Sequence, residues 1–187
     1  MATAFFGDGA INRGPFAESL NWAAAYRLPL LFVCEDTQWS ATTRTYTLSA
    51  GAGAAARARA YGIEAVEVDG NDVEAVYSAA QQLVARVREH GQPALLHART
   101  YRFKGHVSVD PAAYRDPAEL ARALERDPLL IARQRLTDRG TRAAATDAIE
   151  AEARAEVQAA LAAAAAPWPS VTTAFDESHS TGAGHWL

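Results

Sequence analysis

Short apolar runs alternate with segments of helical periodicity along the N-terminal part of the chain. The apolar runs are Thr3–Phe6, Leu30–Cys34, Ala65–Val68 and Pro93–His97. Leu30–Cys34 is a continuous apolar run of the kind typical of strands buried on both faces, and Pro93–His97 indicates another buried strand. Between these runs, apolar residues recur at helical spacing over positions 16–24, 54–61 and 73–90. Strands that alternate with helices require crossover connections, so the pattern predicts an α/β fold with a parallel sheet.

Turn residues mark the boundaries of these predicted helices. Leu28-Pro29 ends the first helix, because proline cannot continue the backbone hydrogen bonding. Asp69-Gly70-Asn71-Asp72 predicts a turn between a strand and a helix. Asp72 can cap the helix that begins at Val73, since its carboxylate can accept hydrogen bonds from the first free backbone N–H groups.

The pattern changes at Tyr101. Residues 101–117 are polar, contain two prolines and show no apolar period, so we predict a long loop. Helices are predicted over 118–126, 128–136 and 147–166, and Pro167-Trp168-Pro169 ends the last one. The tail, which contains His179 and His185, has no usable pattern. We therefore divide the chain into a partial α/β domain, residues 1–116, and a C-terminal helical extension of the same domain with a tail, residues 117–187.

Charge and cysteine content restrict the class of protein. The chain has 18 basic and 22 acidic residues among 187, so it lacks the positive excess typical of nucleic-acid binding. No stretch reaches the roughly 20 apolar residues that a membrane helix needs. Cys34 is the only cysteine, so no internal disulfide can form, and the opening residues lack the features of a secretory signal. These observations predict a soluble, cytoplasmic protein with no nucleic-acid or membrane partner.

The glycine turn after the first predicted strand carries candidate chemistry. Free backbone amides at the start of a helix, from Gly9 and Ala10 onward, could hold a phosphate group. Asp8 would repel that phosphate unless a hard cation lay between them, and Mg²⁺ binds carboxylate and phosphate oxygens together. Ligands in open parallel sheets bind at the carboxyl ends of the strands. A second metal ligand is therefore expected at the end of the neighbouring strand, within Glu35–Trp39.

These residues resemble a known family. Gly-Asp-Gly-Ala-Ile-Asn-Arg-Gly, followed by Glu18, Asn21, Leu28-Pro29 and Phe32–Glu35, resembles the thiamine-diphosphate motif of 2-oxo acid dehydrogenase alpha subunits. The resemblance implies a thiamine-diphosphate-binding fold that lacks its N-terminal strands. It implies that the cofactor, thiamine diphosphate with Mg²⁺, is bound by Gly7, Asp8, Gly9, Ala10 and His106.

The metal ligands that the resemblance implies are the Asp8 carboxylate, Thr37 and the backbone carbonyl of Trp39. Here the sequence departs from the family pattern, because Glu35 is followed by Asp36-Thr37 rather than by two asparagines. A threonine hydroxyl can bind magnesium, but it is shorter than an asparagine amide. It would have to draw the ion or the loop closer, so metal affinity depends on the geometry of this turn.

A second motif lies in the predicted long loop. Thr100–His106 resembles the family's Tyr-Arg-x-x-Gly-His loop at the mouth of the cofactor channel, which becomes ordered when the cofactor binds. The resemblance assigns His106 to catalysis or acyl transfer, tasks that suit a side chain titrating near neutral pH. Val107 replaces the regulatory serine of some family members. Tyr114 and Arg115 are expected to anchor the loop, and His97 is expected to be a satisfied core residue.

The resemblance covers nearly all of residues 3–138, and it also implies partners. Family subunits carry further strands of the same sheet before the glycine turn. Either a separate polypeptide supplies this N-terminal half of the alpha subunit and is one partner, or the chain is a truncated relic or an incorrectly started reading frame. The other implied partners are a beta subunit, which supplies the activating glutamate, the lipoyl acyltransferase and a small 2-oxo acid substrate. The predicted function is decarboxylation of a 2-oxo acid, or cleavage of acetoin, with acyl transfer to lipoamide. The alternatives are a non-catalytic assembly or regulatory subunit with an eroded metal site, and a split transketolase-like subunit.

Overall fold

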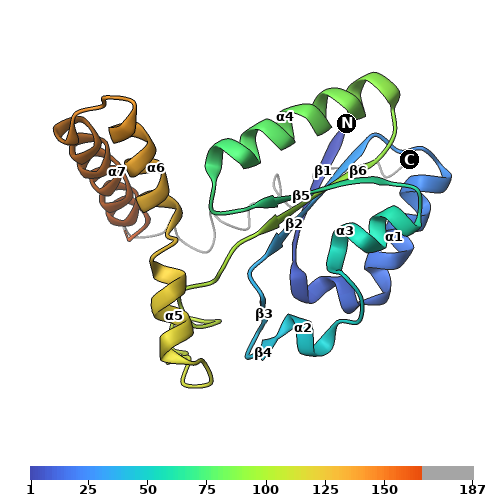
Figure 1. The fold of residues 1–187 in the computed structure, drawn as a ribbon, viewed down its shortest axis with the longest axis horizontal. Coiled ribbons are helices and arrows are strands. Elements are labelled where there is room, and N and C mark those ends of the chain that lie inside the picture. Colours follow the sequence, from blue (N-terminus) through green and yellow to red (C-terminus); the bar gives the residue numbers. More distant parts are fainter. Residues whose placement is uncertain (166–187) are drawn as a thin grey trace, which may run out of the picture. The chain divides into compact units, whose positions relative to one another are not determined.

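A four-stranded parallel sheet forms the centre of the fold in a computed structural model, which describes residues 1–165. The strands are β1 (Ala2–Gly7), β2 (Leu30–Asp36), β5 (Glu64–Asp69) and β6 (Ala94–Arg99), in the spatial order β1-β2-β6-β5 (Figure 1). All three neighbouring pairs are parallel. The predicted α/β class with a parallel sheet is confirmed, and each apolar run contributes one strand.

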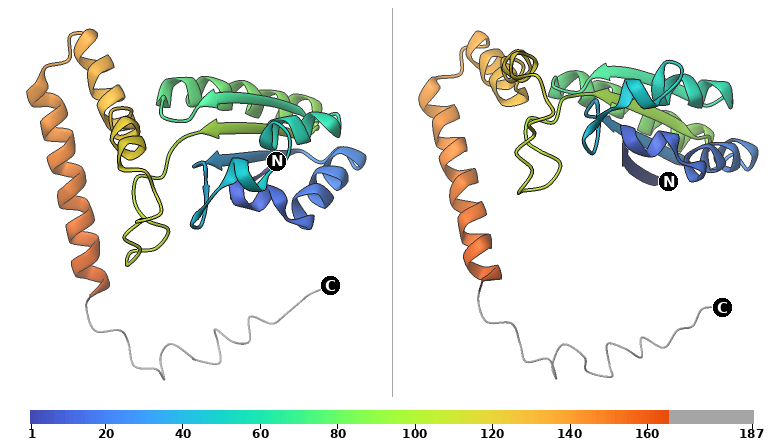
Figure 2. Two further views of the ribbon diagram at one scale, coloured as in Figure 1. Left: turned by 60° about the horizontal axis from the view of Figure 1, so that its bottom comes forward. Right: turned by 90° about the horizontal axis from the view of Figure 1, so that it is seen from below.

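Helices cover both faces of this sheet. They are α1 (Gly14–Ala25), α3 (Gly53–Ala60) and α4 (Val73–His90), and a short 3₁₀ helix, η1 (Asp8–Asn12), precedes α1. Helices α1 and α3 lie on one face and α4 on the other, as two further directions of view also show (Figure 2). This layering explains why the two central strands, β2 and β6, read as apolar runs, since both of their faces are covered.

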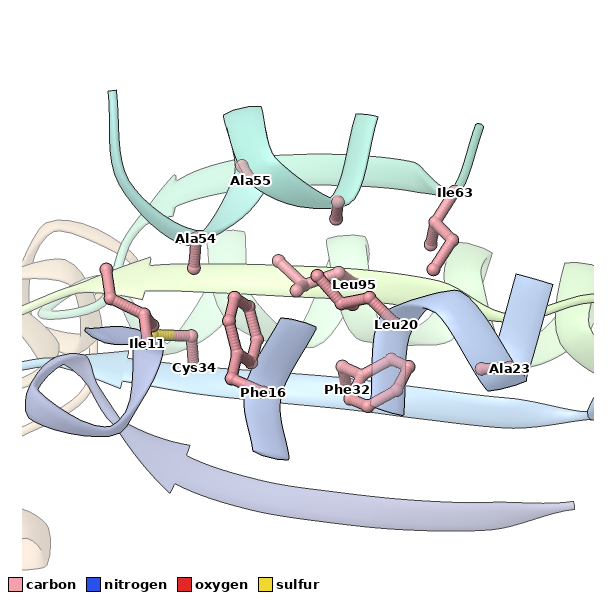
Figure 3. Packing of buried hydrophobic residues seen from close by; sticks show 11 residues of the cluster. Ile11, Phe16, Leu20, Ala23, Phe32, Cys34, Ala54, Ala55, Ile63 and Leu95 are labelled. Carbon is pink, nitrogen blue, oxygen red and sulfur yellow. The ribbon is translucent and has the colours of Figure 1, made fainter. Parts of the chain in front are cut away.

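The core on the α1 and α3 face is made largely of small and aromatic side chains (Figure 3). Leu20 and Ala23 of α1 are fully buried against it, as are three alanines of α3. The small alanine side chains let α3 approach the sheet closely. The buried members of this cluster are Ile11, Phe16, Leu20, Ala23, Phe32, Cys34, Ala54, Ala55, Ala58, Ile63 and Leu95.

The core on the opposite face depends on one stripe of α4. Ala79, Leu83 and Val87 are buried and follow one another at four-residue spacing, which places them on one side of the helix. They pack against Leu31, Val33, Ala94 and Leu96 of the two central strands. The predicted turn before α4 is confirmed, because the Asp72 carboxylate accepts hydrogen bonds from the backbone N–H groups of Glu74 and Ala75, each at 3.1 Å.

A small hairpin and a short helix follow β2, and the apolar pattern did not predict either. They are β3 (Trp39–Ser40), β4 (Thr43–Arg44) and α2 (Thr45–Leu48). These elements are too short to display a period. Gln38 and Ala41 have φ of 66° and 49°, in the left-handed region that non-glycine residues rarely adopt, so the sequence carried no glycine signal for these turns.

The predicted loop and C-terminal helices are also found. Residues 100–116 contain neither helix nor strand, and α5 (Pro117–Leu124), α6 (Pro128–Asp138) and α7 (Ala143–Ala164) follow. Helix α7 begins earlier than predicted, at the alanine-rich start of the segment, because alanine favours helix even where no apolar stripe exists. Pro167–Pro169, His179 and His185 lie outside the described residues.

The chain divides into two compact units, Met1–Leu136 and Thr137–Leu187. The first contains the sheet, its covering helices and the long loop. The domain boundary that we placed after residue 116 stays a prediction about the whole protein. Among residues 1–165, no helix has the length and apolar character to cross a membrane.

Candidate functional site

Polar side chains gather where the parallel strands end. In the sheet register, Gly7 pairs with Glu35, and Arg99 lies between Asp36 and Asp69. The carboxyl ends of all four strands therefore face the same edge. This edge is the usual ligand site of open parallel sheets, because loops that leave adjacent strands can converge there.

Asp8 is the centre of this edge. It follows β1 directly and is only 3% exposed. Its Oδ1 accepts hydrogen bonds from the backbone N–H of Thr37 at 3.2 Å and from the Thr37 hydroxyl at 3.3 Å. Its Oδ2 accepts a hydrogen bond from the hydroxyl of buried Thr45. The carboxylate is thus held by three donors from two segments that follow β2.

The three predicted metal ligands come together in this arrangement. The Thr37 hydroxyl oxygen lies 3.3 Å from Asp8 Oδ1 and 3.4 Å from the backbone carbonyl oxygen of Trp39. Adjacent oxygens around magnesium, with bonds of about 2.05 Å at right angles, are about 2.9 Å apart. The two distances from the Thr37 hydroxyl oxygen are therefore within about 0.5 Å of the spacing that the ion requires. A carboxylate, a hydroxyl and a carbonyl are all hard oxygen ligands of the kind that magnesium prefers.

The site differs from a cluster of acidic and histidine side chains. Within residues 1–165, no group of three or more histidine, cysteine, aspartate or glutamate side chains is arranged to hold a metal ion. A site with one carboxylate neutralises only part of the charge of a divalent cation. Phosphate oxygens are the natural source of the remaining negative charge, since magnesium is often bound by one or two carboxylates together with substrate phosphates.

A cavity opens beside Asp8. Its volume is about 310 Å³, and its lining includes Asp8, Asp36, Thr45 and Arg99. It lies at the strand ends, next to the start of η1. Among the described residues that line the cavity, Arg99 is the cationic side chain. The cavity thus combines a buried carboxylate with a cation, a combination suited to a ligand that carries both a metal ion and anionic groups.

The predicted phosphate-binding turn takes a different form from the one expected. It is the 3₁₀ helix η1, and the long helix α1 begins only at Gly14. The amides of Gly9 and Ala10 therefore belong to a short helix rather than to the start of α1. Gly9 lies close to Ser40, because a Cβ at this position would lie 2.5 Å from the Ser40 hydroxyl oxygen and would force that side chain to move.

The predicted catalytic histidine lies on the long loop. His106 is exposed, and its backbone N–H donates to Asp110 at 2.7 Å. Hydrogen bonds from the backbone N–H groups of His106 and Ala112 and from the Tyr114 hydroxyl hold the pKa of Asp110 below its usual range. Gly105 is required in this turn, since any Cβ would collide with the Asp110 backbone. Asp110 therefore fixes the backbone from which His106 projects.

Arg102 connects this loop to the metal-ligand candidates. Its Nη1 lies 3.4 Å from the Trp39 carbonyl oxygen and 3.4 Å from Nδ1 of His106. Its Nη2 donates to the Ala41 carbonyl at 2.6 Å. One guanidinium thus joins the predicted catalytic histidine to a predicted metal ligand. Arg102 belongs to the predicted loop motif but had no role assigned from the sequence, and Thr45 was not predicted as a site residue.

The expectation that Tyr114 and Arg115 anchor the loop agrees with the geometry. Arg115 is 6% exposed and donates to the backbone carbonyls of Arg102 and Phe103. Its guanidinium lies over the Trp39 ring, 5.2 Å from the centroid. Tyr114 also contacts this ring, with centroids 5.3 Å apart. The loop is therefore attached to the same residue that supplies the predicted carbonyl ligand.

His97 is a buried polar residue beside the site. It is 1% exposed, and its Nε2 lies 2.9 Å from Asp36 Oδ2. Burial raises the pKa of Asp36, but the hydrogen bonds from His97 and from the Gln38 backbone outweigh it, so that the pKa lies below its usual range. Nδ1 of His97 has no hydrogen-bond partner in the described part of the chain. We expected His97 to be a core histidine whose ring nitrogens are hydrogen-bonded. This expectation holds for Nε2 but not for Nδ1.

Comparison with known proteins bears on this site directly. A sequence model of the family described as "Dehydrogenase E1 component" matches residues 1–171. The chain belongs to this family. The match spans both the glycine turn and the histidine loop, and the predicted membership in the 2-oxo acid dehydrogenase alpha-subunit family is confirmed.

Individual E1 relatives agree with this assignment. The chain is 37% identical over 134 residues to "Pyruvate dehydrogenase E1 component subunit alpha" of Rickettsia felis, covering 72% of this chain and 41% of that protein. It is 40% identical over 129 residues to "Pyruvate dehydrogenase E1 component subunit alpha-3, chloroplastic" of Arabidopsis thaliana, covering 69% of this chain and 30% of the relative. The chain therefore spans well under half of the length of these E1 subunits.

Proposed function

We propose that this E1-family chain forms part of the dehydrogenase component that decarboxylates a 2-oxo acid, or cleaves acetoin, and passes the acyl group to lipoamide. The observation that carries the proposal is the convergence of the Asp8 carboxylate, the Thr37 hydroxyl and the Trp39 carbonyl beside a cavity at the strand ends. Family membership supports thiamine diphosphate as the cofactor. The oxygen cluster supports magnesium as the ion that joins its diphosphate to the chain.

The residues of the site fit this cofactor. Asp8, Thr37 and Trp39 would hold the metal ion, while the amides of Gly7, Gly9 and Ala10 would face the diphosphate. Bound thiamine diphosphate supplies an electron sink for decarboxylation. For Thr37 to bind the ion, its hydroxyl oxygen must turn a lone pair toward the metal and release the hydrogen bond to Asp8. A threonine hydroxyl can do so by rotation alone, since it is both donor and acceptor.

His106 is the residue that would handle a proton near the reacting atoms. Arg102 is always a donor, so Nδ1 of His106 is the acceptor in the contact between them. The proton of the neutral imidazole then lies on Nε2. The Nε2–H of this exposed side chain can hydrogen-bond to a substrate group and donate its proton, and only after that transfer can the same nitrogen take a proton back. Arg102 orients the ring and, through the Trp39 carbonyl, links its position to the metal site.

We propose that the activity also depends on partner polypeptides. The chain spans only part of the length of its E1 relatives. We propose that a beta subunit, an N-terminal alpha-subunit segment and a lipoyl acyltransferase form the active assembly with it. We propose the cytoplasm as the location of this assembly. A small 2-oxo acid or acetoin is the proposed substrate. The test is to combine the chain with a beta subunit and the N-terminal segment and to measure magnesium-dependent thiamine diphosphate binding and 2-oxo acid decarboxylation. Absence of binding in this assembly would refute the catalytic proposal.

One observation favours a second function, a non-catalytic assembly subunit. Asp8 already accepts hydrogen bonds from the backbone and hydroxyl of Thr37 and from the hydroxyl of Thr45, so its carboxylate is satisfied without a metal ion. Replacing Thr37 by asparagine separates the two functions. An eroded site gains cofactor affinity strongly in T37N, whereas a working threonine site changes little.

A further inference from the structure

A buried histidine lies directly behind the turn that carries Thr37. His97 sits in the middle of β6, and its Nε2 contacts the carboxylate of Asp36 at 2.9 Å. Asp36 is the last residue of β2 and immediately precedes Thr37. The proposed reaction gives neither side chain a role. A buried polar pair beside a ligand turn is a candidate for holding that turn in place.

The Asp36 carboxylate shapes the turn. Its Oδ1 accepts a hydrogen bond from the backbone N–H of Gln38 at 3.0 Å. Gln38 has a φ of 66°, a conformation that costs a non-glycine residue free energy and persists only where its surroundings impose it. The Gln38 side chain also donates to the Thr100 carbonyl at 2.9 Å. One carboxylate oxygen therefore binds the turn, and the other binds His97.

The position of this turn decides what Thr37 can reach. The Thr37 backbone N–H and hydroxyl lie 3.2 Å and 3.3 Å from Asp8. A threonine hydroxyl is too short to compensate for a displaced backbone, so the whole turn must lie close to Asp8. Because position 37 is a threonine, the groups that fix this turn must hold its backbone close to Asp8.

We infer that His97, acting through Asp36, is a positioning residue that holds the Thr37 turn against Asp8. The inference rests on the proposed function, since the purpose of this position is to present Thr37 to a metal ion. His97 itself has a defined orientation, because it is only 1% exposed and its Nε2 is bonded to Asp36. The Glu67 carboxylate is farther away, 3.9 Å from Nδ1. Asp36 is thus the principal polar partner of the ring.

Hydrogen exchange of the metal-free chain tests the positioning directly. In His97→Leu and Asp36→Ala, we expect the Thr37 and Gln38 amides to exchange at least about tenfold faster, because each change removes one side of the connection. His97→Gln keeps a donor toward Asp36, so this variant should stay close to wild type. Glu67→Gln is the control for a nearby charge. If His97→Leu fails to fold, Asp36→Ala still tests the inference. We expect this variant to fold, because Asp36 lies at the end of its strand.

Metal binding provides the second readout. The probe is Mn²⁺, whose binding is measured by electron paramagnetic resonance in the presence of thiamine diphosphate, with the chain assembled with its partner segments. The His97→Leu and Asp36→Ala variants should bind Mn²⁺ roughly 10–100-fold more weakly than wild type. His97→Gln should restore most of the affinity. Wild-type exchange rates in His97→Leu and Asp36→Ala, or equal Mn²⁺ affinity in all variants, would overturn the inference and leave the proposed function standing. Failure of the wild-type assembly to bind Mn²⁺ would overturn the proposed function, and the exchange rates would still decide the positioning role.

Discussion

Thr45 offers a direct way to perturb Asp8 without replacing any of the proposed metal ligands. Its hydroxyl donates to Asp8 Oδ2, and both residues are buried. Thr45→Val keeps the shape of the side chain and removes the donor. A hydrogen bond to a charged group contributes about 1.5–3 kcal/mol to stability, so we expect the free energy of unfolding to fall by about that amount. With a urea dependence of about 2 kcal/mol per molar, the midpoint of unfolding moves down by roughly 1 M.

The same substitution should weaken the proposed metal site. Without the Thr45 donor, the Asp8 carboxylate can rotate, and the oxygen that faces Thr37 loses its fixed direction. Loss of a partner that orients a metal ligand typically costs 10–100-fold in metal affinity, and we expect a loss of about this size in magnesium-dependent thiamine diphosphate binding. Urea unfolding and calorimetric titration measure the two effects.

Thr47→Val is the matched control. Thr47 is also in α2, but it is exposed and donates to the Arg44 carbonyl. Its replacement should change the unfolding free energy by less than about 0.5 kcal/mol and leave cofactor binding unchanged. If Thr45→Val behaves like Thr47→Val in both assays, Asp8 does not depend on this hydrogen bond and the reasoning is wrong.

Three further changes test other parts of the structure. Leu83→Ala removes a side chain that is 2% exposed in the α4 core and should lower the unfolding free energy by about 2–5 kcal/mol, whereas Leu129→Ala, at 78% exposure, should have almost no effect in the same urea titration. His106→Gln should reduce decarboxylation by the assembled enzyme by about 10²–10⁴-fold and weaken thiamine diphosphate binding much less, and an equal loss of both would argue against a role in proton transfer. The pKa of Asp110 in the folded chain lies below its unfolded value of about 3.9, so its stabilising effect is present above that pH and is lost as the pH falls through the folded pKa. Asp110→Asn should therefore flatten the fall in the melting temperature between pH 5 and pH 3, and an unchanged slope would contradict the assignment.

The strands and the long helices could be predicted because their patterns are strong. Buried runs such as Leu30–Cys34 are covered on both faces, and α4 carries one stripe of apolar residues. The segment 39–48 could not be predicted. Its hairpin and helix are two to four residues long, and their conformation depends on tertiary contacts with Asp8 and with the long loop.

The candidate site was predictable where the residues lie next to one another in a motif. Asp8, Thr37, Trp39 and His106 all came from such motifs. Thr45 is 37 residues from its partner Asp8, and no spacing rule connects the two. His97 reads as part of an apolar strand, and its contact with Asp36 exists only because β2 and β6 are neighbours in the sheet. Contacts that depend on strand order remain hidden from a single sequence.

Binding of thiamine diphosphate by the assembled subunits tests the central claim most directly. Calorimetric titration should detect binding that requires magnesium, disappears with a chelator, and weakens at least about 100-fold in Asp8→Asn, because this change removes the one carboxylate of the proposed site. Binding of equal strength without magnesium, or in Asp8→Asn, would contradict the proposal that Asp8, Thr37 and the Trp39 carbonyl hold the metal ion.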